Sequence, residues 1–226
     1  MEYLSKIIKE KPQETTQKSV ESNKYFTEEA TDLFYKEKRT ARGWMSWIIG
    51  VFFILMSFFG LISDDFWTRT IILITFGIPG VVTIIYGFVA PIKYLVFDRI
   101  NGVIVMPRNF RSAVSIPFST GYAKVKYINS SPGVISALLG FESSKKKGKV
   151  GGLLTEYNIK NYWTFTIWYM DKNRPLPPGD AFDPYRQQDF ERRKAEGFPK
   201  PLYPSKISTP EAIPEQQAER KRIGGW

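Results

Sequence analysis

Two long apolar segments, separated by only seven residues, constrain the fold of this chain more than any other feature. They run from Trp44 to Ile62 and from Thr70 to Ala90, and neither contains Lys, Arg, Asp or Glu. A helix rises about 1.5 Å per residue, so about 20 helical residues cross the hydrocarbon core of a bilayer, which is about 30 Å thick. Because lipid offers the backbone no hydrogen-bond partners, each segment should be helical. The pattern predicts a transmembrane helical hairpin over residues 44–90; a buried hairpin in a soluble core is the alternative.

Basic residues lie on both outer flanks of the two apolar segments, whereas the short connection is acidic. The basic residues are Lys36, Lys38, Arg39 and Arg42 before the first segment and Lys93, Arg99, Arg108 and Arg111 after the second. The connection carries Asp64 and Asp65 against a single Arg69. Because Lys and Arg next to a span are retained in the cytoplasm, the pattern predicts two spans with both termini cytoplasmic.

The chain contains no histidine and no cysteine among its 226 residues. It therefore lacks the usual general base near neutral pH, the commonest metal ligand, disulfides and every imidazole-dependent triad. No cofactor and no metal site are expected. The net charge of +10 would suit nucleic acid, but much of it flanks the apolar segments, where attraction to an anionic leaflet explains it. The lipid bilayer is thus the expected partner, and nucleic acid is not.

Residues 1–43 are predicted to form a cytoplasmic N-terminal region with a juxtamembrane amphipathic helix after a mobile start. Thr27 is a candidate N-cap for that helix. The apolar stripe of the helix consists of Phe26, Ala30, Leu33 and Phe34. Such a helix would lie on the membrane surface or pack on the β domain of the protein, and the sequence leaves both interpretations open.

Small residues in the second apolar segment favour close helix packing. Gly77, Gly80 and Gly87 are candidates for contacts within the hairpin or with a second copy of the chain, which would form a homo-oligomer. Pro79 removes a backbone hydrogen bond and should bend this helix. No ionisable residue lies inside either segment, which argues against a proton or ion relay in the membrane.

After Pro91 the pattern changes to short β-rich runs, so residues 91–173 are predicted to form a small cytoplasmic antiparallel β domain. Asn101-Gly102 is a strong hairpin-turn signal between the first two runs. The predicted strands are 94–97, 103–106, 113–116, 122–128 and 162–169. The fold class is therefore an α+β membrane protein: a two-helix transmembrane hairpin, a small antiparallel β domain and a C-terminal Pro-rich segment with one helix.

A lysine-rich loop interrupts the predicted β domain. Its lysines are Lys145, Lys146, Lys147 and Lys149, and its glycine spacing matches neither a phosphate-binding loop nor a dinucleotide fingerprint. A solvated hairpin tip is the simple interpretation, and contact with anionic lipid headgroups is the functional one.

Residues 174–204 are predicted to form a Pro-rich docking segment that contains a helix. Prolines at 175, 177 and 178 favour an extended run, Asp183-Pro184 should open a helix, and Gly197 should end it. Residues 205–226 are rich in Pro, Glu, Gln and Lys and are predicted to be a flexible tail.

Four motifs of this C-terminal region resemble a known family. They are Pro175-Leu-Pro-Pro-Gly179, Phe182-Asp-Pro-Tyr-Arg186, Glu191-Arg-Arg-Lys-Ala-Glu-Gly-Phe-Pro199 and Leu202-Tyr-Pro-Ser205. They are similar to the tail of a little-characterised family of proteobacterial two-span inner-membrane proteins, often encoded beside type VI secretion effectors. Some proteins of this architecture are immunity proteins, so the resemblance implies a location in the bacterial inner membrane and protection of the producing cell from a membrane-active toxin.

The leading hypothesis is a non-enzymatic inner-membrane binding protein, namely an immunity protein that neutralises a pore-forming type VI effector, its cognate toxin. The candidate partner-binding residues are Phe182, Asp183, Tyr185, Arg186, Arg192 and Arg193, because aromatic and arginine side chains dominate binding hot spots. Their alternative role is to hold the tail on the β domain. A membrane-anchored scaffold or assembly factor for a secretion or envelope complex is the alternative function. A lipid-acting enzyme is a third hypothesis, for which the sequence offers no convincing carboxylate pair.

Overall fold

The computed structural model describes residues 2–22, 27–39, 44–89, 91–108, 111–131, 134–143, 151–155 and 158–226. The chain divides into two compact units. Unit 1 combines Met1–Lys38 with Tyr94–Trp226, and unit 2 is Arg39–Lys93. The N-terminal region, the β region and the C-terminal segments, which the sequence suggested as separate domains, thus contribute to one folded unit.

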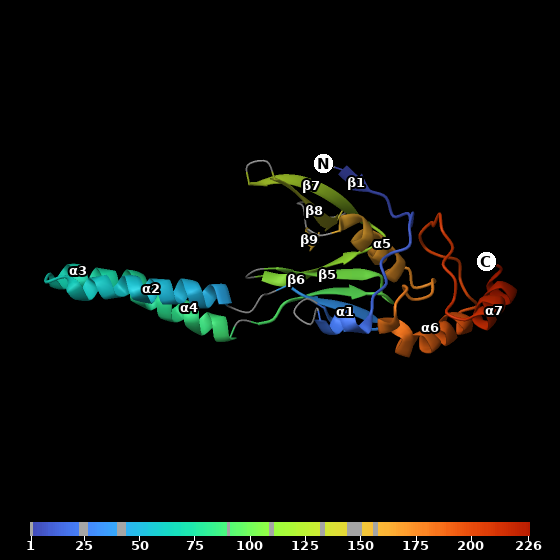
Figure 1. Ribbon diagram of the computed structural model, residues 1–226, viewed down its shortest axis with the longest axis horizontal. Coiled ribbons are helices and arrows are strands. Elements are labelled where there is room, and N and C mark those ends of the chain that lie inside the picture. The colour runs from blue at the N-terminus through green and yellow to red at the C-terminus, as the bar shows by residue number, and fades with distance from the viewer. Residues whose placement is uncertain are drawn as a thin grey trace. The chain divides into compact units, whose positions relative to one another are not determined.

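Unit 1 contains two antiparallel sheets, of order β1-β7-β8-β9 and β2-β3-β4-β5-β6 (Figure 1). The strands are β1 (Glu2–Leu4), β2 (Thr27–Ala30), β3 (Phe34–Lys38), β4 (Tyr94–Asp98), β5 (Val103–Arg108), β6 (Arg111–Pro117), β7 (Gly121–Ser131), β8 (Val134–Ser143) and β9 (Gly151–Thr155). The predicted fold class is therefore wrong. The described residues form two sheets with strands from both sides of the apolar region, instead of one small sheet after it.

The predicted juxtamembrane helix is a β-hairpin instead. β2 pairs with β3, and β3 pairs along its whole length with β4. Tyr35 and Glu37 are buried and alternate with half-buried neighbours, which is the two-residue period of a strand. The Thr31 hydroxyl group closes the turn by donating to the Phe34 carbonyl at 3.0 Å and accepting from the Phe34 N–H at 2.9 Å. Pairing with β4, which lies about 60 residues away along the chain, overrides the helical spacing.

Helix α5 (Ile159–Tyr169) occupies the position of the strand predicted over 162–169. The ring of Trp163 lies 6.2 Å from that of Phe141 on β8, and the ring of Phe165 lies 5.1 Å from that of Tyr35 on β3. The helix therefore packs against both sheets, and every residue from Trp163 to Tyr169 is buried. A helix buried on all sides has no amphipathic period, so its sequence could not be told from that of a strand.

Both ends of the chain join the core of unit 1, in place of the predicted mobile start and flexible tail. Ile8 is fully buried. Its N–H donates to the Pro204 carbonyl at 3.0 Å, and its carbonyl accepts from the Lys206 N–H at 2.8 Å. The remaining helices are α1 (Gln17–Ser22), η2 (Asp180–Phe182), α6 (Asp183–Ala195) and α7 (Pro214–Gly224). Helix α6 matches the predicted helix: Pro184 lies in its first turn, and Gly197 follows it with a φ of 74°.

Unit 2 consists of two apolar helical segments joined by a short turn. The first is α2 (Trp44–Ile62), and the second is continuous through α3 (Phe66–Ile72), the π-helical η1 (Leu73–Gly77) and α4 (Ile78–Val89). Asp65 caps α3 by accepting from the Thr68 N–H at 2.7 Å. The π-helical turn ends just before Pro79, whose missing N–H interrupts the regular ladder of hydrogen bonds.

The predicted two-span transmembrane hairpin is wrong in its number of spans. Among the described residues one helix, Phe66–Val89 with 24 residues, is long and apolar enough to cross a membrane. The first segment contributes a shorter apolar helix, Ser46–Ile62.

Unit 2 is inserted between two paired strands of unit 1. The pairing of β3 with β4 ends with Lys38 opposite Tyr94, and the Arg39 N–H then donates to the Lys93 carbonyl at 2.8 Å. The chain therefore leaves for the apolar helices and returns from them at adjacent points of one sheet.

Candidate functional site

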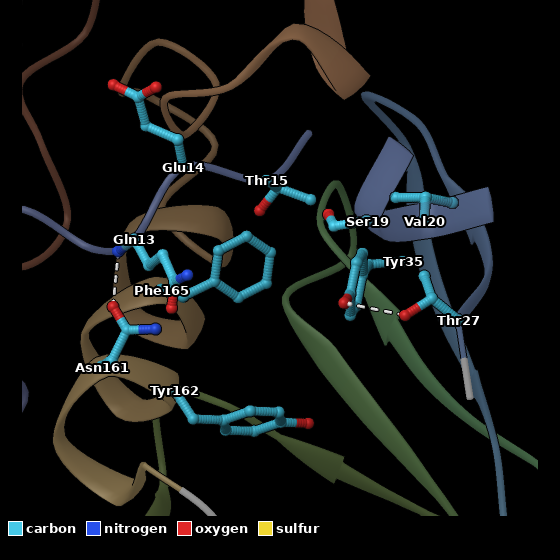
Figure 2. A pocket seen from close by; sticks show the side chains of 10 residues that line it. All are labelled: Gln13, Glu14, Thr15, Ser19, Val20, Thr27, Tyr35, Asn161, Tyr162 and Phe165. Atoms are coloured by element: carbon cyan, nitrogen blue, oxygen red, sulfur yellow. Dashed lines mark hydrogen bonds between the residues drawn. The ribbon is translucent and has the colours of Figure 1, made fainter. Parts of the chain in front are cut away.

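A pocket of about 250 Å³ in unit 1 opens between the N-terminal segment, α1, the β2–β3 hairpin and α5 (Figure 2). Its lining residues are Gln13, Glu14, Thr15, Ser19, Val20, Thr27, Tyr35, Asn161, Tyr162 and Phe165. No signal in the sequence indicated this pocket, because its walls come from segments about 150 residues apart.

Hydrogen bonds to later parts of the chain hold the N-terminal wall in place. The Gln13 N–H donates to Asn161 Oδ1 at 2.5 Å. The Thr15 N–H donates to the Pro178 carbonyl at 3.0 Å, and the Ala181 N–H donates to the Thr15 carbonyl at 3.2 Å. The pocket is thus a property of the assembled unit and of the Pro-rich segment in particular.

Aromatic rings from β3 and α5 line the cavity. The Tyr35 and Phe165 rings are inclined at 60° and form a corner. The Tyr162 hydroxyl group donates to Glu37 Oε1 at 2.8 Å, which fixes the third ring. The hydroxyl groups of Tyr35 and Thr27 lie at the opposite wall (Figure 2). Their oxygen atoms are 3.4 Å apart. The cavity therefore presents flat apolar surfaces next to hydroxyl and amide groups.

The lining of the pocket includes one charged residue, Glu14. Its carboxylate forms an exposed ion pair with Lys11 at 3.0 Å and points away from the cavity in Figure 2. With no basic residue in the lining, the cavity suits an uncharged polar group with an apolar face better than an anion.

A larger groove, of about 550 Å³, lies beside the Pro-rich segment. Two of the predicted partner-binding residues, Asp183 and Arg186, line it. Arg186 donates to the carbonyls of Leu176, Pro177 and Gly179 at 3.2, 2.9 and 2.7 Å, so its guanidinium group holds the Pro-rich loop in shape. Asp183 pairs with Arg186 at 2.7 Å and keeps most of its side chain exposed.

The other predicted partner-binding residues are fully or partly buried within unit 1. Phe182 is fully buried, with its ring 6.0 Å from that of Tyr169, and Tyr185 packs partly buried against the same core. Arg192 is half-buried and donates to the Lys172 carbonyl at 2.6 Å, while Arg193 is buried. These contacts fit the alternative role, in which the residues hold the tail on the rest of unit 1; their role in binding stays a prediction.

Arg193 belongs to a buried ionic cluster that joins α6 to the C-terminal segment. It donates to Asp189 Oδ2 at 2.9 Å and to both carboxylate oxygens of Glu211 at 2.7 and 2.8 Å. Arg220 of α7 also pairs with Glu211 at 3.0 Å, and the fully buried Arg99 lies 3.4 Å from Asp189. Burial lowers the pKa of Arg193, but its bonds to Glu211 and the charge of Asp189 outweigh burial and keep that pKa above its ordinary value. The cluster joins α6 to Arg99, Glu211 and Arg220, which are distant from one another or from α6 in the chain, so sequence analysis did not anticipate it.

Asp32 lies at the edge of this cluster, and Asp32→Asn is expected to raise the melting temperature at neutral pH. The pKa of Asp32 lies above its ordinary value of 3.8, and burial is the main cause. A backbone hydrogen bond acts in the opposite direction, and the charge of Asp189 adds to the increase. A carboxyl group with a raised folded-state pKa stabilises the protein below its unfolded pKa, and that contribution is lost as pH rises through the folded pKa. At pH 7 the buried carboxylate therefore opposes folding, and asparagine removes this penalty.

The measurement for Asp32→Asn is calorimetric melting at pH 7 and at pH 4, with the exposed Asp64→Asn as the control. The gain of the Asp32 variant should shrink towards pH 4, and the control should show no gain at either pH. A lower melting temperature of Asp32→Asn at pH 7 would contradict the assigned direction.

The predicted helix-packing glycines lie within unit 2, and two of them are buried. A Cβ atom at Gly80 would lie 2.8 Å from Ile54 Cγ1, and one at Gly87 would lie 3.2 Å from Ser46 Cβ. At Gly77 the nearest atom would be Ser57 Cβ at 3.7 Å, an ordinary contact. All three therefore face α2 of the same chain. The predicted lipid-contacting residues Lys145, Lys146, Lys147 and Lys149 lie outside the described residues.

Comparison with known proteins gives no assignment: no protein-family model, no curated protein and no solved structure matches this chain. The family resemblance of the tail motifs therefore stays a prediction.

Proposed function

We propose that this chain is a membrane-tethered binding protein without catalytic activity, located in the bacterial inner membrane with both termini in the cytoplasm. The insertion of apolar unit 2 between the paired strands β3 and β4 carries the proposal. Because Lys38 lies opposite Tyr94, the two ends of the inserted apolar unit lie at neighbouring points of one sheet, and we place both on the same side of the bilayer. Such a tether holds a folded unit with a pocket and a groove at the membrane surface.

The distribution of charge supports the proposed orientation. Lys38, Arg39 and Lys93 lie where the chain passes from unit 1 into unit 2 and back, whereas the turn inside unit 2 carries Asp64 and Asp65. Basic residues next to an apolar helix favour the cytoplasmic side. The absence of His and Cys from the sequence leaves no residue for imidazole- or thiolate-based catalysis, which supports a binding role.

Within this class, immunity against a membrane-directed type VI effector is the specific function we propose. A tether in the inner membrane places the protein where such a toxin must act. The groove beside the Pro-rich segment and the exposed Asp183 provide a surface for the partner. A scaffold for an envelope complex has the same architecture but would not depend on a neighbouring toxin.

Two measurements test this proposal. Alkaline carbonate extraction should leave the full-length protein in the membrane pellet, and its release into the supernatant would overturn the tether. In a contact competition, cells that lack the gene should be depolarised or killed by siblings with an active type VI apparatus and survive beside siblings with a disabled one. Complementation with the intact gene should restore survival. Equal survival in both mixtures would overturn the immunity function and leave the scaffold.

A further inference from the structure

The β7–β8 hairpin extends beyond the core of unit 1. Its two strands pair from one end of β7 to the other. In the first half of β7, Ala123 and Val125 are buried, and β1 pairs with this part of the strand. Further along the same strand, Tyr127 is 59% exposed and Ile128 is 43% exposed. The far half of the hairpin therefore leaves the core with an aromatic and an aliphatic side chain in the open.

This far half carries very little charge for an exposed pair of strands. Between residues 126 and 141 the sequence contains one charged side chain, that of Lys126, and no Asp or Glu. The described pairing of β1 ends at Val125, where the Tyr127 hydroxyl group donates a long hydrogen bond of 3.4 Å to Glu2. Natural proteins usually place charged side chains on a strand that borders a sheet, because these prevent unwanted association. The hairpin lacks this protection where it leaves the core, so it is suited to contact with an apolar surface.

The far end of the hairpin lies at the end of unit 1 from which the chain passes into unit 2. That end is marked by Lys38 opposite Tyr94. From it β4 runs away, β5 returns and β6 runs away again, because each strand is antiparallel to the next. A tight turn, in which the Thr120 N–H donates to the Pro117 carbonyl at 3.3 Å, then reverses the chain into β7, and β8 contacts β6. Figure 1 shows the far end of β7 on the same side of unit 1 as the end of β5 and the start of β6.

The hairpin also reaches further in this direction than the neighbouring strand. β6 has seven residues and β7 has eleven, and the difference corresponds to about 13 Å of extended strand. The connections into unit 2 are short, since five residues separate Lys38 from Trp44 and four separate Val89 from Tyr94. Such connections span at most about 20 Å. If unit 2 enters a bilayer, as proposed above, the far end of the hairpin lies within reach of the same bilayer surface.

We infer that the far half of the β7–β8 hairpin, with Tyr127 and Ile128, inserts into the headgroup layer of the bilayer that holds unit 2. A tyrosine ring suits this depth because its apolar body meets lipid while its hydroxyl group meets water. The long side chain of Lys126 allows its ammonium group to stay among the headgroups. This contact rests on the proposed tether. It adds a second attachment of unit 1, which would fix the orientation of the pocket and the groove relative to the membrane.

The test measures how closely the hairpin approaches lipid. Because the chain has no cysteine, Ile128→Cys carries a single NBD fluorophore on the full-length protein in phosphatidylcholine vesicles. The matched control is Ile213→Cys, since Ile213 is 48% exposed and precedes α7, which Figure 1 shows at the other end of unit 1. Phosphatidylcholine with a nitroxide near its headgroup should quench the label at position 128 at least about twofold more strongly than the label at position 213.

Removal of the aromatic ring tests the role of Tyr127. In the Ile128→Cys background, Tyr127→Ser should lower the quenching towards that of the control, because the ring no longer holds the hairpin at the headgroups. Equal quenching at positions 128 and 213 would overturn the contact. A disulfide-linked dimer of unlabelled Ile128→Cys would show that the hairpin meets a second copy of the chain, and would overturn it as well. Carbonate extraction in parallel separates the two proposals: equal quenching of protein retained in the pellet refutes this contact alone, whereas release refutes the tether and the contact together.

Discussion

Replacement of Arg193 by alanine is expected to destabilise unit 1 by about 3–5 kcal/mol, the usual cost of removing one partner from a buried ionic group. Arg193, Asp189 and Glu211 are each at most 2% exposed at the side chain. The alanine variant would remove the donor that these two buried carboxylates share and leave Asp189 with Arg192 and Glu211 with Arg220. Chemical denaturation followed by circular dichroism measures the loss, with the midpoint shifting to lower denaturant at unchanged slope.

The neighbouring residue of α6 provides the control for Arg193. Lys194 pairs with Glu219 at 2.8 Å, but its side chain is 38% exposed. Lys194→Ala should therefore cost less than about 1 kcal/mol. A loss of similar size in the two alanine variants would contradict the view that burial, and not the mere number of ion pairs, makes the cluster important.

Local signals in the sequence predicted the elements that local chemistry determines. Asn101-Gly102 marks the β4–β5 turn, where Gly102 has a φ of 63°, a conformation that side chains disfavour. Asp183-Pro184 and Gly197 delimit α6 because a proline suits the first helical turn and a glycine suits the residue after the last. These elements do not depend on distant contacts.

The wrong predictions concern elements that tertiary contacts determine. The stripe of Phe26, Ala30, Leu33 and Phe34 has helical spacing, but β3 becomes a strand because β4 pairs with it across the whole apolar insertion. Helix α5 is buried on all sides, so neither a helical nor a strand period was available to identify it. The predicted flexible tail contains Arg220 and Glu211, whose partners lie on α6 and in the tail itself.

The candidate site was less predictable than the fold for the same reason. The pocket forms where Gln13 meets Asn161, which lies 148 positions away in the chain. The sequence identified Arg108 and Arg111 as basic residues after an apolar segment, but only the register of β5 and β6 makes them direct partners. The sequence also grouped Arg99 with them, although the fold buries it beside Asp189.

The packing inside unit 2 gives the second large expected effect. Ser57 and Gly77 face each other, with a calculated Cβ–Cβ separation of 3.7 Å, which is close to the mean for disulfides. The chain has no cysteine of its own, so Ser57→Cys/Gly77→Cys should form one intramolecular disulfide on mild oxidation in membranes. Gel electrophoresis without reductant should show a faster-migrating monomer. A cross-linked dimer would instead indicate that these faces meet in a second copy of the chain.

In this double-cysteine background, Gly80→Val should slow the formation of the disulfide about tenfold, because added bulk at a close helix contact costs about 1–3 kcal/mol. At Gly80 a Cβ atom would lie 2.8 Å from Ile54 Cγ1 and 3.1 Å from the Gly50 carbonyl oxygen, so the helices must move apart. Val82→Ala, at an exposed position of the same helix, is the control and should leave the rate unchanged. An unchanged rate with Gly80→Val would mean that the two helices do not depend on this contact, and the close packing of α2 on α4 would be wrong.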